Sequence, residues 1–255
     1  MARDTKKNAA KPKRRIWLAA ILALTFFGCT AYAALEVRRY AISSPSFVLS
    51  RDQPEALTIV GLRYASHSKV THVFSEDFGH SIFSIPLAAR RRRLLGIDWV
   101  EDASVSRVWP GRLIVRLKER HPVAFVSFPT GVLLIDAYGV LLDPPPQSQF
   151  SFPVLSGVRE DQEEYRRAEC VRILLRIQRE LGAHAGEISE VNAADPDNVL
   201  VVARVDNRAV ELLMGDSGFG DRYVKFLNAY PEIHRKSPDG KVFDLRLEDR
   251  ITVKE

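Results

Sequence analysis

Cysteine is scarce in this 255-residue chain, which holds only Cys29 and Cys170. Cys29 lies in a long apolar run and Cys170 in a helix predicted outside that run, so the two cannot pair within one chain. Two cysteines are too few for a disulfide framework. Apolar residues make up 46% of the sequence, which is enough for a packed core, and Cys170 is predicted to be a small buried apolar residue.

Motifs for metals, phosphates and dinucleotides are also missing. His67 and His72 are five residues apart, so they do not share a helix face as ligands four residues apart would. No cysteine pair or His-Glu-x-x-His motif accompanies them. The sequence has no glycine-rich phosphate loop and no dinucleotide fingerprint. We therefore predict no metal site and no cofactor.

Excess positive charge is confined to the start of the chain. The net charge is +5, and residues 1–15 carry seven Lys and Arg against one Asp, whereas residues 16–35 carry no charge. The remaining 220 residues are therefore close to neutral. No basic surface is left for a phosphate backbone, which argues against nucleic-acid binding.

Residues 16–35 form an uncharged, mainly apolar run. As a helix it would be about 30 Å long, enough to cross the hydrocarbon core of a membrane. The basic residues before it predict a cytoplasmic N-terminus and an exported body. A cleaved signal peptide is the alternative, because Ala31-Tyr32-Ala33 resembles a small-x-small cleavage site. A lipoprotein at Cys29 is disfavoured by the bulky Phe26 and Phe27.

The next part of the chain predicts a small domain with the order strand, helix, helix, strand, strand. Residues 36–55 show little pattern and are interpreted as a linker. The predicted elements are a strand at 57–60, a helix capped by Ser68, a helix at 86–96, and alternating strands around 103–106 and 113–117. Pro110 and Gly111 are typical of the centre of a type II turn. Two helices and three strands can close a complete α+β domain.

The four arginines at 90–93 lie on the second of these helices. We interpret them as a solvated face, with Leu87, Leu94 and Leu95 packed inward. Contact with lipid headgroups is the alternative.

The rest of the sequence predicts a mixed β-sheet domain with two helices. An apolar stripe from Cys170 to Leu181 indicates one amphipathic helix, ended by Gly182, and a second is predicted to stop before Pro231. Strands are predicted at 123–128, 132–135, 140–142, 188–191, 199–205, 209–214, 242–247 and 251–253. The fold class is therefore α+β.

Gly215-Asp216-Ser217-Gly218 matches the nucleophile loop of chymotrypsin-like serine proteases. That chemistry needs a histidine base oriented by a carboxylate, and the motif continues here with Phe219-Gly220 instead of Gly-Pro. We interpret Asp216 or Ser217 as the cap of a helix beginning near Phe219. An exported serine hydrolase using Ser217 remains an alternative.

Glu119-Arg120-His121 combines an acid, a cation and a base at the end of a predicted strand. Strand alternation places Glu119 and His121 on one side and Arg120 on the other, so the three do not converge. We interpret them as a polar strand end with local ion pairing. Pro122 restricts the backbone of its neighbours and predicts a stiff, extended junction between two domains.

An ordered set of motifs resembles the FtsQ/DivIB cell-division proteins, whose architecture is a basic tail, one membrane span, a POTRA domain and a β-domain. The motifs are Asp98-Trp99-Val100, Ala103-x-Val105-x-Arg107, Pro110, Leu113-x-Val115-x-Leu117-x-Glu119-Arg120-x-Pro122-Val123-Ala124, Leu134-Ile135-Asp136-x-x-Gly139-Val140-Leu141, Phe152-Pro153-Val154-Leu155-x-Gly157 and Val242-Phe243-Asp244-Leu245-Arg246-Leu247. The resemblance implies a tail at 1–15, a span at 16–35, a linker at 36–55, a POTRA domain at 56–122 and a β-domain at 123–255.

The resemblance further implies a non-enzymatic, bitopic scaffold of the divisome at the septum, in the inner membrane. In this family the C-terminal strand region recruits the FtsB–FtsL pair, and the POTRA domain contacts other division proteins. Arg246 and Leu247 match that region, with Phe243 and Leu245 as support and Ile251 and Val253 as further candidates. An unpaired edge strand can accept a partner strand. A POTRA-type secretion or envelope-assembly adaptor is the alternative function.

Overall fold

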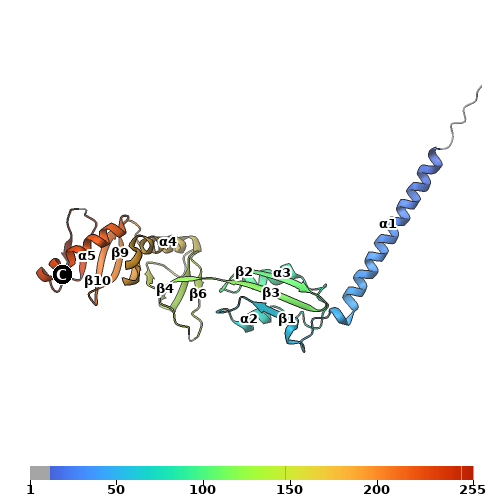
Figure 1. Ribbon diagram of the computed structural model, residues 1–255, viewed down its shortest axis with the longest axis horizontal. Coiled ribbons are helices and arrows are strands. Elements are labelled where there is room, and N and C mark those ends of the chain that lie inside the picture. Colours follow the sequence, from blue (N-terminus) through green and yellow to red (C-terminus); the bar gives the residue numbers. More distant parts are fainter. Residues whose placement is uncertain (1–11, 147, 248, 255) are drawn as a thin grey trace, which may run out of the picture. The chain divides into compact units, whose positions relative to one another are not determined.

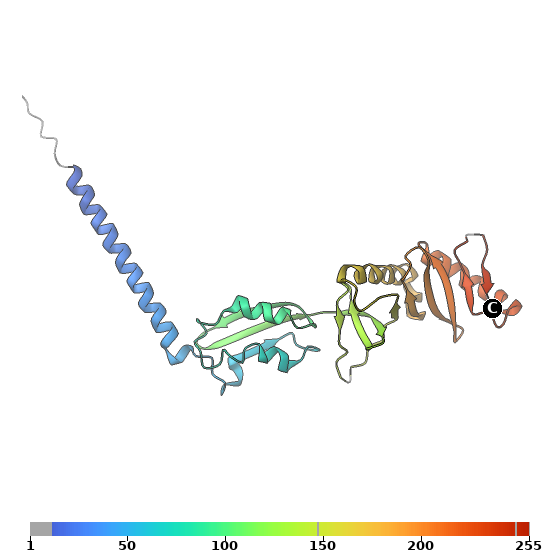
Figure 2. The same cartoon turned by 180° about the vertical axis from the view of Figure 1, so that it is seen from behind.

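A computed structural model describes residues 12–146, 148–247 and 249–254 (Figure 1; Figure 2 gives the view from behind). The chain divides into two compact units. The first contains the residues up to Val60, with Val70–Arg93 and Ala103–Arg116. The second contains Gly61–Lys69, Leu94–Asp102 and the residues from Leu117 onward.

The first element is a single long helix, α1 (Pro12–Ser43). Its part from Ala19 to Ser43 is long and apolar enough to cross a membrane. The helix continues eight residues beyond the predicted end at Leu35, so the expected linker is helical in its first part. Glu36 ends the uncharged pattern, but Glu, Arg and Ala are good helix formers and continue the helix. The helix ends shortly before Pro45.

A three-stranded sheet follows with the predicted element order. Its elements are β1 (Leu57–Val60), α2 (His67–His72), α3 (Leu87–Leu95), β2 (Val100–Val108) and β3 (Arg112–Glu119). The strand order is β1-β3-β2, with β1 parallel to β3. Leu113 and Val115 of β3 are fully buried while Arg112 and Arg116 are exposed, as the period of two predicted.

Two local predictions in this part are wrong. Gly111 does not have the positive φ of a type II turn, and the Trp109–Pro110 peptide is cis. A glycine is needed there for a different reason, because an added Cβ would lie 2.7 Å from the carbonyl oxygen of Val48. The residue before α2 that bonds to its first turn is Ser66, whose hydroxyl accepts the N–H of Lys69, whereas Ser68 lies inside the helix.

The arginine run on α3 is not uniformly solvated, which corrects the sequence interpretation. Arg90 is buried and forms a bidentate pair with the buried Asp77, at 2.6 and 2.8 Å. Arg91 donates to the carbonyl of Ala103 on β2. Arg92 and Arg93 are exposed. Leu94 is buried as predicted. The helix therefore packs its apolar side inward even though it also carries a buried ion pair.

The second sheet has nine strands in the order β12-β11-β10-β9-β8-β7-β4-β5-β6. It is mixed, since β4–β7, β7–β8 and β10–β11 are parallel and the other pairs are antiparallel. The strands are β4 (Pro122–Phe128), β5 (Gly131–Asp136), β6 (Leu141–Leu142), β7 (Val154–Ser156), β8 (Ile188–Asn192), β9 (Val199–Val205), β10 (Arg208–Gly215), β11 (Val242–Asp244) and β12 (Thr252–Lys254).

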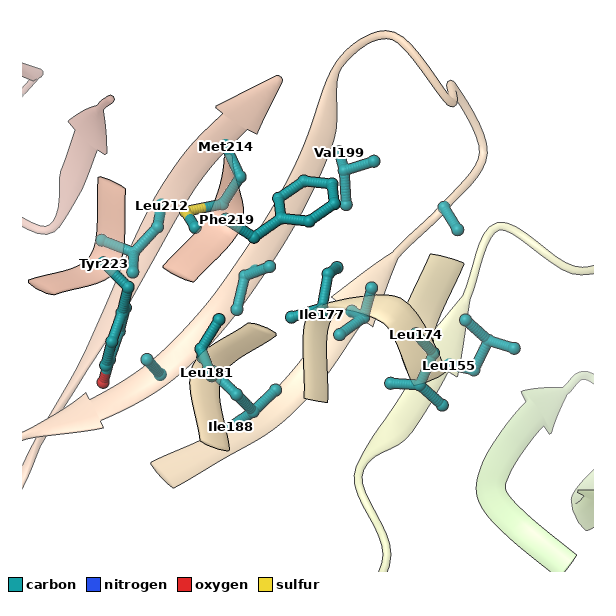
Figure 3. Packing of buried hydrophobic residues seen from close by; sticks show 14 of the residues in the cluster. Leu155, Leu174, Ile177, Leu181, Ile188, Val199, Leu212, Met214, Phe219 and Tyr223 are labelled. Carbon is teal, nitrogen blue, oxygen red and sulfur yellow. The ribbon is translucent and has the colours of Figure 1, made fainter. Parts of the chain in front are cut away.

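Two helices, α4 (Glu164–Leu181) and α5 (Phe219–Lys236), pack onto this sheet. Figure 3 shows side chains of both helices, such as Ile177 and Phe219, meeting Leu212 and Met214 of β10 in one apolar core. Gly182 ends α4 as predicted, with a φ of 55°.

The predicted end of α5 before Pro231 is wrong, because the helix continues through that residue to Lys236. Proline inside a helix removes one backbone donor and its ring clashes with the carbonyl four residues earlier, so a helix that continues through it needs compensating contacts. Tyr230, next to Pro231, is buried and its ring contacts those of Phe226 and Phe243. This packing holds the helical turn on both sides of the proline.

Candidate partner-binding site

The C-terminal residues place a short strand at the edge of the nine-stranded sheet. β12 pairs antiparallel with β11, in the register Phe243 to Val253, and has no second neighbour among the described residues. One side of its backbone therefore presents N–H and C=O groups that are free to bond with an added strand. β11 is shorter than the strand predicted at 242–247, because the chain turns after Asp244.

The six residues predicted to bind a partner divide into core and surface. Phe243 and Leu245 are buried, so their side chains support the region from inside. Ile251 and Val253 are half-buried against the same core. Leu247 is 44% exposed and is the large apolar side chain of this set that is available at the surface.

Arg246 is anchored within the chain. Its guanidinium donates to both carboxylate oxygens of Asp244, at 2.9 and 2.6 Å, and to the side-chain oxygen of Asn198 at 2.8 Å. The Asp244 carboxylate also accepts the N–H of Arg246, which closes the turn after β11. A partner that binds Arg246 must share the guanidinium with these acceptors, so the residue orders the turn as well as offering charge.

The same contact lowers the pKa of Asp244 below its ordinary value of 3.8, chiefly through the Arg246 hydrogen bonds. A carboxyl with a depressed folded-state pKa contributes stability that is present above its unfolded pKa and is lost as the pH falls through the folded value. Acidification from pH 7 to pH 3 should therefore destabilise the wild type more than Asp244→Asn. Thermal unfolding at both pH values measures this difference.

The control for this prediction is Asp161→Asn, which removes the carboxylate of the exposed Arg159 pair. Solvent screens such a pair, so its loss should change the pH dependence less. Equal pH dependence of the wild type and Asp244→Asn would contradict the role given to the Asp244–Arg246 pair.

A pocket of about 300 Å³ lies beside this C-terminal segment. Its walls come from the C-terminal segment and from the start of α5, and they comprise Ser217, Gly218, Asp221, Arg222, Lys225, Leu245, Leu247 and Ile251. A second hollow, of about 520 Å³, shares Asp221 and Lys225 with it and continues along α5 past Val224 and Asn228. Together they form a groove with an apolar wall at Leu247 and charged groups on α5.

Sequence reasoning missed the α5 side of this groove. Asp221, Arg222 and Lys225 are not part of the apolar stripe that identified the helix, and nothing in the sequence indicates what they face. Arg222 is held in place by donation to the carbonyl of Met214. It lies against Gly215, whose added Cβ would be 2.6 Å from the guanidinium.

Ser217 lies at the rim of this groove, and its surroundings do not support a nucleophile. Its hydroxyl donates to the Asp216 carboxylate at 2.8 Å, so the contact is with an acid rather than an imidazole. The predicted cap by Asp216 or Ser217 is also wrong. Glu180 of α4 accepts the N–H of Phe219 at 2.8 Å, and a carboxylate from a neighbouring helix thus caps α5.

The junction residues Glu119, Arg120 and Pro122 are placed in the second unit. Glu119 is buried, and its carboxylate accepts the N–H groups of Arg63, Tyr64 and Ala65 at 2.8 to 2.9 Å. This contact corrects the interpretation of Glu119 as a polar strand end with an ion pair. Its charge is stabilised by three consecutive backbone dipoles of the segment after β1.

Arg120 and Pro122 tie the same junction to β5. Arg120 pairs with Asp136 at 2.8 Å, and its N–H donates to the carbonyl of Trp99. Pro122 begins β4 opposite Asp136. The Trp99 indole in turn donates to the carbonyl of Asp143 at 2.9 Å. The chain between β3 and β4 is therefore bonded both to Trp99 and to Asp136 at the end of β5.

The described residues include no group of three or more His, Cys, Asp or Glu side chains that could hold a metal ion. His67 and His72 stand at the two ends of α2, consistent with their spacing of five. Cys170 is half-buried, its thiol lies 3.6 Å from the carbonyl of Ala193, and burial raises its pKa.

Two family models match consecutive parts of the chain. One is described as "POTRA domain, FtsQ-type" and matches residues 53–120, and the other as "Cell division protein FtsQ/DivIB, C-terminal" and matches residues 124–246. Together they cover about three quarters of the chain.

Several relatives carry the name "Cell division protein FtsQ". That of Koribacter versatilis is 32% identical over 206 residues, which is 78% of this chain and 59% of the relative. That of Syntrophotalea carbinolica is 23% identical over 99% of this chain and 90% of the relative. This chain therefore matches less than two thirds of the length of the Koribacter protein, and it matches 32% of the length of the relative from Zymomonas mobilis.

A solved structure of the major extracytoplasmic domain of the trans isomer of the cell division protein DivIB from Geobacillus stearothermophilus also matches. It is 23% identical and covers 48% of this chain and 96% of that domain, with a TM-score of 0.28.

Proposed function

We propose that this chain, which belongs to the FtsQ/DivIB family of bacterial cell division proteins, is a non-enzymatic, membrane-anchored scaffold that links other division proteins at the septum. The observation that supports this most is the C-terminal edge of the nine-stranded sheet, where β12 and Leu247 border the groove along α5. An open strand edge beside an apolar groove is suited to holding a protein segment.

The proposed topology follows from the N-terminal helix and the charges before it. Residues 1–15 form a cytoplasmic tail, residues 16–35 cross the inner membrane once, and residues 36–55 connect to the exported domains. The POTRA domain covers 56–122 and the β-domain 123–255. The basic tail favours this orientation by the positive-inside rule.

The proposed partners are single-span division proteins of the FtsB and FtsL type, which bind the β-domain through its C-terminal region. The POTRA domain contacts other division proteins. Main-chain bonding to β12 supplies affinity, while the groove beside Leu247 selects apolar side chains of the partner. The buried Phe243 and Leu245 keep this edge in place without touching the partner.

A fluorescent fusion of the full chain is expected to gather at mid-cell in dividing cells and to leave that position after division. This result follows if the chain is recruited by, and recruits, division proteins. Time-resolved imaging of the fusion at native expression level measures it. The readout also separates the scaffold from a secretion or envelope-assembly adaptor, which has no reason to concentrate at the division site.

The matched control is a fusion of residues 1–43 alone, which contains the tail and α1 but neither sheet. It should spread evenly over the membrane. Uniform membrane fluorescence of the full chain throughout the cell cycle would contradict the proposed function.

A further inference from the structure

Four aromatic side chains gather at the end of α1 in the first unit. The rings of Phe47, Phe83 and Trp109 lie 5.2 to 5.6 Å apart, and the Tyr40 ring is 6.4 Å from that of Phe47. Tyr40 is 67% exposed and Trp109 is 66% exposed, while Phe47 and Phe83 are half-buried. We call these four residues the aromatic foot.

The aromatic foot is fixed to α1 by hydrogen bonds as well as by ring contacts. The Ser81 hydroxyl donates to the carbonyl of Ala41 on α1 at 2.8 Å. The N–H of Ile82 donates to the carbonyl of Phe47 at 2.8 Å, and the buried Ser44 donates its N–H to the carbonyl of Tyr40. The rings therefore keep their place next to the last turn of the helix.

The position of Tyr40 along α1 sets the depth of the foot. The uncharged run ends at Leu35, and Tyr40 lies five residues later in the same unbroken helix. Five residues of helix advance about 7.5 Å. The headgroup layer on each side of a bilayer is about 5–8 Å thick. If residues 16–35 occupy the hydrocarbon core, Tyr40 and the rings that contact it lie at the level of the headgroups.

Aromatic side chains with a polar end favour that level. Trp and Tyr are enriched where membrane and water meet, because the ring is apolar and its N–H or O–H can bond to water or lipid oxygens. An exposed cluster that contains Trp109 is unfavourable in water and favourable against lipid. Continuity with the membrane span therefore identifies phospholipid as the occupant of this surface.

We propose that the aromatic foot inserts into the phospholipid headgroup layer, on the side of the bilayer where the folded units lie. Contact through Trp109, on the loop between β2 and β3, fixes the tilt of the three-stranded sheet against the membrane. This inference rests on the membrane anchor of the proposed function but does not depend on the division role or on any protein partner.

Tryptophan fluorescence in bilayers tests this contact, because the chain has three tryptophans, Trp17, Trp99 and Trp109. The full chain is reconstituted into phosphatidylcholine bilayers that contain lipid with a nitroxide either near the glycerol or near the end of the acyl chain. Trp17→Phe is compared with Trp17→Phe/Trp109→Phe, so that the buried Trp99 is the same in both. The shallow nitroxide should reduce the emission of Trp17→Phe severalfold more than that of the double variant, and the deep nitroxide should reduce it less.

Equal fractional quenching of these two variants by the shallow nitroxide would overturn the proposal. The exposed aromatic foot would then be a surface for a protein partner instead of lipid. The wild type compared with Trp17→Phe reports separately on the helix. If Trp17 is quenched while Trp109 is not, the proposed lipid contact of the aromatic foot is wrong, but the proposed membrane anchor is supported. If neither is quenched, both fail.

Discussion

Replacement of Glu119 by alanine is expected to lower the free energy of unfolding by about 3 kcal/mol, because hydrogen bonds to a charged group contribute about 1.5–3 kcal/mol and their loss leaves buried donors unpaired. Three such donors, the N–H groups of Arg63, Tyr64 and Ala65, converge on this carboxylate. Urea unfolding of the detergent-solubilised full chain measures the loss. Amide hydrogen exchange at these three residues should accelerate in parallel.

The control for Glu119→Ala is Glu101→Ala on β2. Glu101 pairs with the exposed Lys118 of β3, and an exposed ion pair of this kind contributes about 0–1 kcal/mol. Glu119→Gln keeps one acceptor oxygen, so its loss of stability should lie between those of Glu119→Ala and Glu101→Ala. A Glu119→Ala protein as stable as Glu101→Ala would show that the junction does not depend on this carboxylate.

Replacement of Leu247 by aspartate is expected to weaken binding of an FtsB/FtsL-type partner by about 30-fold or more, which corresponds to ~2 kcal/mol. Leu247 is exposed on the apolar wall of the groove, so a charge there opposes an apolar partner side chain without entering the core. Binding of the purified full chain to the purified partner pair measures the change.

The matched control is Val132→Asp, which places the same charge at a 53% exposed residue of β5, near the opposite end of the sheet. Its partner affinity should equal that of the wild type. If Leu247→Asp bound as tightly as Val132→Asp, the groove would not be the docking site.

Two proline substitutions test the strand edge separately from the groove. In an antiparallel pair, successive residues of an edge strand direct their N–H groups alternately to the neighbouring strand and to the outside. One of Thr252→Pro and Val253→Pro should therefore break a bond to β11, and the other should remove only an outward donor. If main-chain bonding to β12 contributes to partner affinity, the variant that keeps its thermal stability should still bind the partner more weakly than the wild type.

The sequence pattern predicted the elements whose residues repeat regularly. Leu113 and Val115 follow the period of two, and the apolar stripe around Leu174 and Ile177 follows the period of a helix. No strand was predicted at β7, whose three residues lie between Pro153 and Gly157, two residue types that usually mark turns and loops. The prediction that the helix ends before Pro231 was wrong because tertiary packing of Tyr230 outweighs the cost of a proline inside the helix.

The candidate site was less predictable because its contacts join distant parts of the chain. Glu119 meets Tyr64 across 55 residues, and Phe219 is capped by Glu180 across 39. No local pattern specifies such partners. The resemblance predicted Leu247 as a candidate contact residue, but the groove beside it exists only because α5 brings Arg222 and Lys225 to the same place.

The central proposal is that a division partner binds at the C-terminal edge of the nine-stranded sheet, beside Leu247. The most direct test places the photoreactive amino acid p-benzoylphenylalanine at Leu247 of the full chain and irradiates dividing cells. The expected result is an adduct whose second component, identified by mass spectrometry, is a single-span division protein of the FtsB/FtsL type. The same amino acid at Val132 should give no such adduct. Adducts of equal yield at both positions, or none with a division protein at Leu247, would contradict the proposed docking site.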